Sequence, residues 1–128
     1  MKLQDLTVLV VDDFRTMRSV IKNILKQIDI TNVLEAHNGA KALDVLHENA
    51  VDLILSDWNM PRMTGIDFLR AVRADGDLRE LPFVMVTAEG MRENIVEAIQ
   101  AGANGYIIKP FTPDQLREKI ERIFEDAG

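Results

Sequence analysis

The sequence predicts an α/β fold of the (βα)5 kind, in which helices cover both faces of an open, parallel, five-stranded sheet. Five short runs rich in apolar and β-branched residues occur along the chain, at residues 7–11, 33–36, 53–56, 83–87 and 105–108. The first run is apolar at nearly every position, which is typical of a strand buried on both faces. Helical patterns separate the runs, and these connections are long enough for right-handed crossovers between parallel strands.

The first strand and the helix after it have clear patterns. Residues 7–11 read Thr-Val-Leu-Val-Val, and apolar residues then recur at steps of three and four, namely at Phe14, Met17, Ile21, Ile24, Leu25 and Ile28. This spacing predicts a helix with one apolar face. Basic residues lie mostly on its other side, at positions 15, 18, 22 and 26. We therefore expect the apolar stripe, including Phe14, to face the sheet.

The later helices are marked by their ends. Thr64-Gly65-Ile66-Asp67 and Thr112-Pro113-Asp114-Gln115 each begin with a threonine that can cap a helix. The second segment also has Pro at the first helical position and Gln at the third. Apolar stripes follow both segments. Gly102, which comes just after a stripe ending at Ile99, predicts a glycine stop for the fourth helix.

Composition limits the class of protein. The chain has 128 residues, 47% of them hydrophobic, so we expect a single domain spanning residues 1–128. There is no cysteine, which excludes disulfides and thiolate metal sites. The net charge of −6 and the pI of about 4.9 argue against binding to nucleic acid. No secretory signal and no apolar run of membrane-spanning length are visible, so we expect a cytoplasmic protein that does not bind a membrane.

Polar residues follow four of the five predicted strands. Asp12 and Asp13 end the first strand, Asp57 the third and Thr87 the fourth, and Lys109 comes after the fifth. In open α/β sheets, ligands bind outside the carboxyl ends of the strands. If the first and third strands are neighbours, three carboxylates meet across a strand spacing of about 4.8 Å.

Each of these residues also has an ordinary structural explanation. Asp12 or Asp13 can cap the helix that begins near Phe14, and Asp57 can belong to a turn. A threonine in a strand and a lysine at the surface need no special role. Capping and turn formation do not explain why three acids, a hydroxyl and a cation all converge on one edge. A metal-assisted phosphoryl site uses all of them.

The chemistry of such a site follows from the side chains. Clustered carboxylates repel each other unless a cation neutralises them, and ligands that are all oxygen favour a hard ion such as Mg²⁺. With Asp12 and Asp13 holding the metal, Asp57 can attack phosphorus as a nucleophile and form an acyl phosphate. Lys109 and the Thr87 hydroxyl can then offset the charge of the phosphoryl oxygens.

Five segments, taken in order, resemble the receiver domains of two-component response regulators, and among these the stand-alone chemotaxis regulators. They are Val10-Val11-Asp12-Asp13-Phe14, Ser56-Asp57-Trp58-Asn59-Met60-Pro61, Met85-Val86-Thr87-Ala88-Glu89, Gly105-Tyr106 and Lys109-Pro110-Phe111. The resemblance covers essentially the whole chain. It implies the flavodoxin-like strand order 2-1-3-4-5 and a single receiver domain with no output domain.

The resemblance implies a role for each site residue. A phosphohistidine on a sensor kinase would phosphorylate Asp57, and Thr87 and Lys109 would contact the phosphoryl group. Asp13, Asp57 and the backbone carbonyl of Asn59 would bind Mg²⁺, with Asp12 contributing through water. Lys109-Pro110 is expected to be a cis peptide.

The resemblance also implies roles outside the phosphoryl site. Asn59 and Glu89 occupy positions that tune how fast water removes the phosphoryl group. Tyr106, in the fifth strand, would rotate inward behind Thr87 and act as the switch, although without the resemblance we would expect an ordinary packed aromatic. Ile95, Tyr106, Ile108 and Lys119 match the face that meets a flagellar-motor target. Thr64 stands where the family usually has an acid, and Gly90 where a less flexible residue is common.

Several functions remain in competition. The leading hypothesis is a monomeric chemotaxis switch, not an enzyme, which assists its own phosphorylation and dephosphorylation. Its partners would be a chemotaxis sensor histidine kinase and the flagellar motor switch protein, and the need for a phosphatase stays open. The alternative is a phosphorelay receiver or phosphate sink that passes phosphate to a histidine phosphotransfer protein.

Two further classes fit the sequence poorly. Aspartyl-phosphate phosphatases and mutases carry an Asp-x-Asp motif after the first strand, and that spacing is absent here. A nucleotide- or flavin-binding module needs a glycine-rich loop at that place. The chain has Asp-Asp-Phe-Arg-Thr there instead, and its two acids would repel a phosphate.

Overall fold

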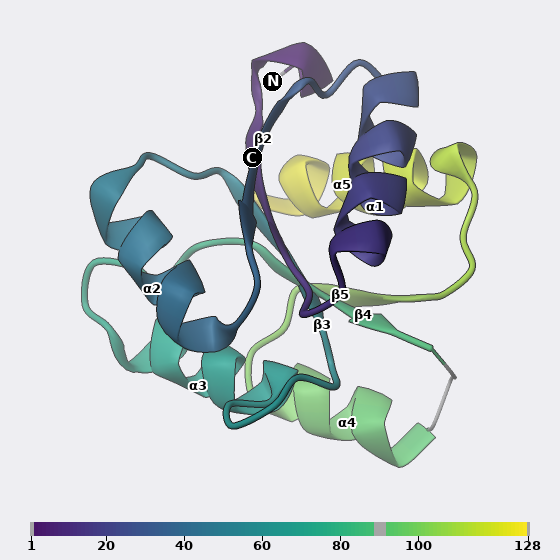
Figure 1. Cartoon of the computed structure of the whole chain (residues 1–128). Helices are drawn as coiled ribbons and strands as arrows, with labels where there is room; N and C mark the ends of the chain where they lie inside the picture. Colours follow the sequence, from purple (N-terminus) through teal and green to yellow (C-terminus); the bar gives the residue numbers. More distant parts are fainter. Residues whose placement is uncertain (1, 89–91, 128) are drawn as a thin grey trace.

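The computed structural model describes residues 2–88 and 92–127, which form alternating strands and helices (Figure 1). In chain order the elements are η1 (Leu3–Asp5), β1 (Thr7–Val11), α1 (Arg15–Gln27), β2 (Asn32–Ala36), α2 (Gly39–Glu48), β3 (Leu53–Asp57), α3 (Gly65–Ala74), β4 (Phe83–Thr87), α4 (Arg92–Gln100), β5 (Gly105–Ile108) and α5 (Pro113–Ala127). The five predicted strands are all present, and three of them have the predicted bounds. The predicted α/β class is confirmed.

The strands form one parallel sheet in the order β2-β1-β3-β4-β5, as the resemblance implied. The register places Val11 beside Ser56 in the central pair of strands. The residues that follow, Asp12 and Asp57, therefore lie level with each other at the carboxyl edge. On the other side of β3, Asp57 pairs with Val86, so Thr87 ends β4 at the same edge.

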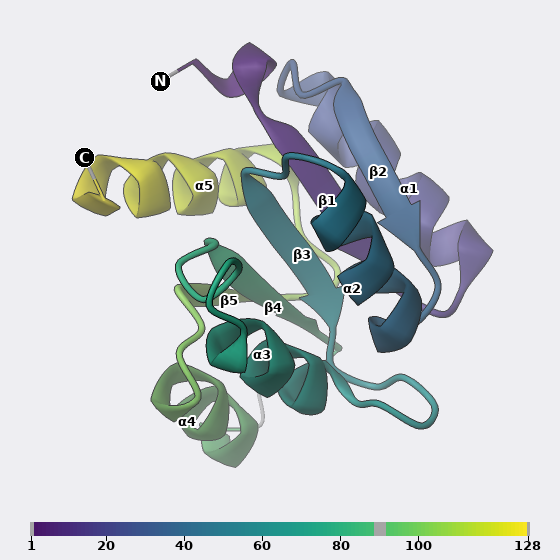
Figure 2. The same ribbon diagram turned by 90° about the vertical axis from the view of Figure 1, so that its left-hand side faces the viewer.

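Helices cover both faces of the sheet, with α1 and α5 on one face and α2, α3 and α4 on the other (Figures 1 and 2). Alternate residues of the central strands enter two separate cores. In β1, Val8 and Val10 pack toward α1 and α5, whereas Leu9 and Val11 pack toward the other three helices. Burial of each such side chain stabilises the fold by about 1.5–3 kcal/mol. This double burial explains why the strands have no polar face.

The predicted helix ends are also present. Thr64 and Asp67 form a capping box at the start of α3, with the Thr64 hydroxyl accepting from the Asp67 N–H at 3.3 Å. The fold thus accepts threonine where the family usually has an acid. Thr112 and Gln115 exchange similar hydrogen bonds before α5. Gly102, just after α4, has a φ of +104°, which favours glycine.

The prediction that Phe14 faces the sheet was wrong. Helix α1 begins at Arg15, and Phe14 precedes it in an extended conformation with φ −99° and ψ 118°. Because the helical stripe does not extend to this residue, its ring points outward and is 68% exposed. Among the described residues, no helix is long and apolar enough to cross a membrane.

Candidate functional site

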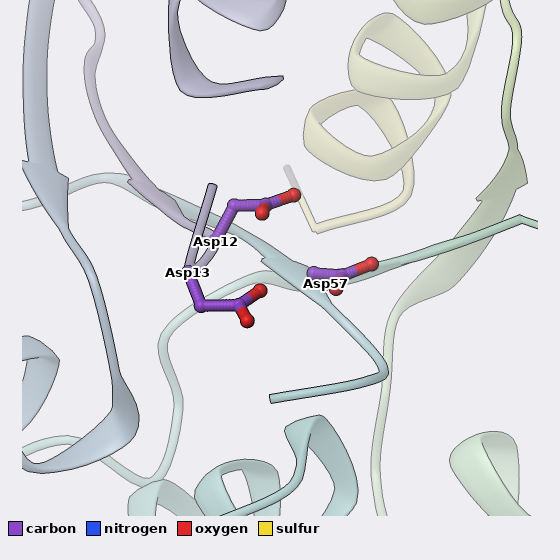
Figure 3. Close-up of side chains that lie close together, drawn as sticks. All are labelled: Asp12, Asp13 and Asp57. Carbon is purple, nitrogen blue, oxygen red and sulfur yellow. The ribbon is translucent and has the colours of Figure 1, made fainter. Parts of the chain in front are cut away.

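Three carboxylates meet at the carboxyl edge of the sheet, as the sequence predicted. One oxygen from each of Asp12, Asp13 and Asp57 lies within 4.8 Å of the other two (Figure 3). Asp12 and Asp13 follow β1, and Asp57 is the last residue of β3. We call these three residues the acid cluster.

Two oxygens of the acid cluster have unused hydrogen-bonding capacity. The Oδ1 of Asp12 accepts the Phe14 N–H at 2.9 Å. In contrast, Oδ2 of Asp12 and Oδ1 of Asp13 are buried without a hydrogen-bond partner among the described residues. Helix capping does not account for this arrangement, because the N-cap of α1 is Phe14. Buried carboxylate oxygens that lack donors are suited to a cation.

Lys109 reaches the acid cluster from two strands away. Its Nζ lies 3.0 Å from Oδ1 of Asp57 and 3.8 Å from Oδ2 of Asp12, and the second distance is too long for a hydrogen bond. Its backbone N–H donates to the Thr87 carbonyl at 2.7 Å, which fixes the start of the loop beside the end of β4. The Lys109–Pro110 peptide is cis, as the resemblance implied.

When no metal is bound, burial and mutual repulsion disfavour the charged forms of Asp12 and Asp57. Burial raises the pKa of Asp12, and the charge of Asp57 adds to the rise, while the Phe14 N–H and Lys109 oppose it. Burial likewise raises the pKa of Asp57, although the Lys109 hydrogen bond opposes that effect. Among the described residues, Lys109 is the one side chain that forms ion pairs with the acid cluster, so a further positive charge is favourable here.

Two other predicted site residues, Thr87 and Asn59, end or follow strands at the same edge of the sheet. Thr87 is buried at the end of β4. Asn59 is exposed in the loop after β3, two residues beyond Asp57. Glu89 and Gly90 lie outside the described residues. Gly65, at the start of α3, approaches so closely that a Cβ there would collide with the Asp57 carbonyl oxygen.

The predicted output face lies on α4, β5 and α5. Tyr106 is half-buried, and the Nζ of Lys119 lies 5.0 Å from the centre of its ring. Tyr106, Ile108 and Lys119 contribute to the lining of a surface hollow of about 480 Å³. Ile95 is half-buried. Val96 and Ile99 are 47% and 49% exposed on α4, and no sequence motif marked them as part of this face.

One contact to the acid cluster had no signal in the sequence. Arg18 in α1 donates from Nη1 to the backbone carbonyl of Asp12 at 2.7 Å. Helical periodicity places Arg18 on the polar side of α1, and nothing in that pattern predicts a bond to a particular carbonyl.

Comparison with known protein families gives a match over residues 8–121 to the response regulator receiver domain. The chain belongs to this family. The receiver domain is 58% identical over 118 residues to a chemotaxis protein CheY of Pseudomonas aeruginosa, an alignment that covers 92% of this chain and 95% of that protein. It is 50% identical over 122 residues to CheY-3 of Vibrio cholerae, covering 95% and 94%.

Solved structures agree with these relatives. The receiver domain superimposes on Vibrio cholerae CheY4 with a TM-score of 0.85 and 35% identity, covering 92% of this chain and 98% of the other. It is therefore a CheY-like response regulator receiver domain, a signalling switch of the chemotaxis type.

Proposed function

We propose that this receiver domain is a chemotaxis response regulator that accepts a phosphoryl group on Asp57 in a Mg²⁺-dependent reaction. The observation that carries the proposal is the acid cluster. Two of its buried oxygens have no hydrogen-bond donor among the described residues, and the Lys109 Nζ lies 3.0 Å from Asp57 and 3.8 Å from Asp12. The CheY relatives support the chemotaxis role over a phosphorelay role.

The residues present suit Mg²⁺. The acid cluster offers only oxygen ligands, and the unpartnered oxygens of Asp12 and Asp13 are positioned to receive a hard cation. Asp13, Asp57 and the Asn59 carbonyl would hold the ion, and Asp12 would contribute through water. When bound, Mg²⁺ neutralises the carboxylates and draws electron density from the phosphoryl oxygens.

The transfer itself is a substitution at phosphorus. A carboxylate oxygen of Asp57 attacks the phosphorus of a kinase phosphohistidine, so that a P–O bond forms as the P–N bond breaks. The electron pair of the P–N bond stays on the imidazole. Lys109, already 3.0 Å from Asp57, stabilises the negative charge that gathers on the phosphoryl oxygens, and the buried Thr87 hydroxyl adds a donor. Asn59 and Glu89 would set how quickly water reverses the modification.

Phosphorylation adds charge and acceptor oxygens beside Thr87. Movement of Thr87 toward the phosphoryl group would leave room for Tyr106 to turn inward from its half-buried position. That rotation would change the surface around Ile95, Ile108 and Lys119. A flagellar motor switch protein would bind this surface, and a chemotaxis sensor kinase would supply the phosphoryl group in the cytoplasm.

Phosphorylation-dependent binding tests the proposal. The purified protein would be treated with acetyl phosphate and Mg²⁺, and its affinity measured for a motor-switch peptide and for a histidine phosphotransfer protein. We expect tighter binding to the peptide after treatment, and no gain in the Asp57→Asn variant. Phosphoryl transfer to the phosphotransfer protein without a gain in peptide binding would favour a relay and contradict the motor-switch role.

A further inference from the structure

Arg18 connects the turn that carries Asp12 and Asp13 to the edge strand β2 of the sheet. Its Nη1 donates to the Asp12 carbonyl at 2.7 Å, and its Nε donates to Oε1 of Glu35 in β2 at 3.0 Å. Lys22, one turn further along α1, holds the other oxygen of Glu35 at 3.0 Å. The Arg18 side chain is only 14% exposed. The guanidinium is therefore fixed between two acceptors.

The turn that carries Asp12 and Asp13 has few other restraints. The Asp12 N–H donates to the Ala36 carbonyl at 3.2 Å, and the Phe14 N–H donates to the Asp12 carboxylate at 2.9 Å. No side chain caps the α1 helix that follows. The bond from Arg18 is shorter than either of these and comes from a charged donor, which makes it the stronger kind.

We propose that Arg18, oriented by Glu35, is a positioning residue for the metal site, which fixes the backbone at Asp12 so that the acid cluster is ready for the ion. This inference rests on the proposed function. A planar guanidinium is suited to the task because its fork of donors holds two acceptors in a fixed relation. Lysine has a single ammonium group and cannot reproduce that geometry.

Glu35 also offsets the positive charge that Arg18 brings to the site. Burial opposes its ionisation, but hydrogen bonds from Lys22 and Arg18 outweigh burial and lower the pKa of Glu35. Its charge is therefore present at neutral pH and offsets the charge of Arg18. Arg18 paired with Glu35 can therefore lie beside a cation site without strong repulsion of the cation.

Positioning and simple electrostatics predict opposite results when Arg18 is removed. Loss of a positive charge near the acid cluster would, by Coulomb's law alone, strengthen Mg²⁺ binding. Loss of the support for the Asp12 backbone would weaken it, because groups that orient metal ligands typically contribute about 10–100-fold to affinity. The sign of the change therefore separates the two effects.

The experiment measures Mg²⁺ affinity by isothermal titration calorimetry on the full chain. Arg18→Met is expected to bind Mg²⁺ about tenfold more weakly than the parent. Arg18→Lys keeps the charge and should also bind more weakly, by a smaller factor. The matched control is Arg70→Met, which removes an exposed ion pair with Glu97 on α3 and α4, away from the acid cluster, and should leave the affinity unchanged.

Three results would overturn the inference. Tighter Mg²⁺ binding by Arg18→Met would mean that Arg18 acts through its charge, and equal binding would mean that Arg18 does not position the site. If Arg18→Met does not fold, as judged by circular dichroism, Arg18→Lys takes its place in the test. A Mg²⁺ affinity of Arg18→Lys equal to that of the parent would then overturn the inference. Absence of Mg²⁺ binding by the parent protein would instead refute the proposed function, and the inference with it. The parent titration thus distinguishes the two failures.

Discussion

Replacement of Asp12 by asparagine should stabilise the metal-free protein while it weakens the metal site. Asparagine has nearly the same shape, and its Oδ1 can still accept the Phe14 N–H. The amide nitrogen would take the place of the buried Oδ2, which has no hydrogen-bond partner in the described part of the chain. The substitution therefore removes a charge with little change in packing.

The size of the effect follows from the distances. With an effective dielectric constant of about 20, a repulsion at the upper limit of 4.8 Å costs about 3.5 kcal/mol, and Asp12 has two neighbours within that limit in the acid cluster. Attraction to Lys109 at 3.8 Å returns about 4.4 kcal/mol. The balance is a net repulsion of about 3 kcal/mol. We expect a gain of about 1–3 kcal/mol in the free energy of unfolding, because solvent screens part of the repulsion.

Urea unfolding at neutral pH in EDTA measures this gain directly. Addition of Mg²⁺ should then stabilise the parent more than Asp12→Asn, since ligand binding to the native state adds stability by mass action. The control is Asp44→Asn, which removes an exposed carboxylate from α2. A loss of more than about 1 kcal/mol by Asp12→Asn in EDTA would refute the idea that the acid cluster is held against repulsion.

Burial of the carboxylates, together with the repulsion between them, fixes the sign of a pH dependence. Because the folded-state pKa values of Asp12 and Asp57 are raised above 3.8, the native protein binds protons more tightly than the unfolded chain. The contribution of these two carboxyl groups to the stability of the metal-free protein should therefore rise as pH falls from neutral through these raised values. Asp12→Asn should show a smaller rise. An equal rise in stability in the parent and in Asp12→Asn would mean that Asp12 is not the group responsible.

Two further predictions concern other parts of the fold. Gly65→Ala should destabilise the protein by about 1–3 kcal/mol in urea and slow phosphorylation, because its Cβ would displace the Asp57 carbonyl. Gly76→Ala, where a Cβ meets open space, is the control, and equal stability of the two variants would contradict the argument. NMR titration of His47 should give a pKa above 6.5, because its 2.8 Å hydrogen bond to Asp75 favours the protonated ring. The small contribution of this hydrogen bond to stability should be lost as pH rises through the pKa of His47. Asp75→Asn should return the pKa of His47 toward 6.5. An unchanged pKa in that variant would exclude the His47–Asp75 pair as the cause.

Most of the architecture was predictable because local and long-range signals agree. Buried parallel strands must be apolar on both faces, and helix ends need caps such as Thr64. Phe14 was assigned wrongly because its spacing fits a helical stripe, although the backbone enters the helix one residue later. Periodicity cannot locate such a boundary, since the first residue before a helix can have an extended conformation.

The acid cluster was predictable for a topological reason. Parallel strands bring their carboxyl ends to one edge, so Asp12, Asp57 and Lys109 converge whatever the details of packing. The bond from Arg18 to the Asp12 carbonyl depends on how α1 lies against β2, and a charged residue on a helix gives no sign of it. Strand order and the output face were expected from family resemblance.

The most direct test of the central claim is the intact mass of the protein after treatment with acetyl phosphate and Mg²⁺. The account predicts that the parent gains the mass of one phosphoryl group, that EDTA abolishes the gain, and that Asp57→Asn shows none. The matched variant Asp44→Asn should be modified like the parent. A phosphoryl adduct that persists in Asp57→Asn, or no adduct in the parent, would contradict the assignment of Asp57 as the phosphoacceptor.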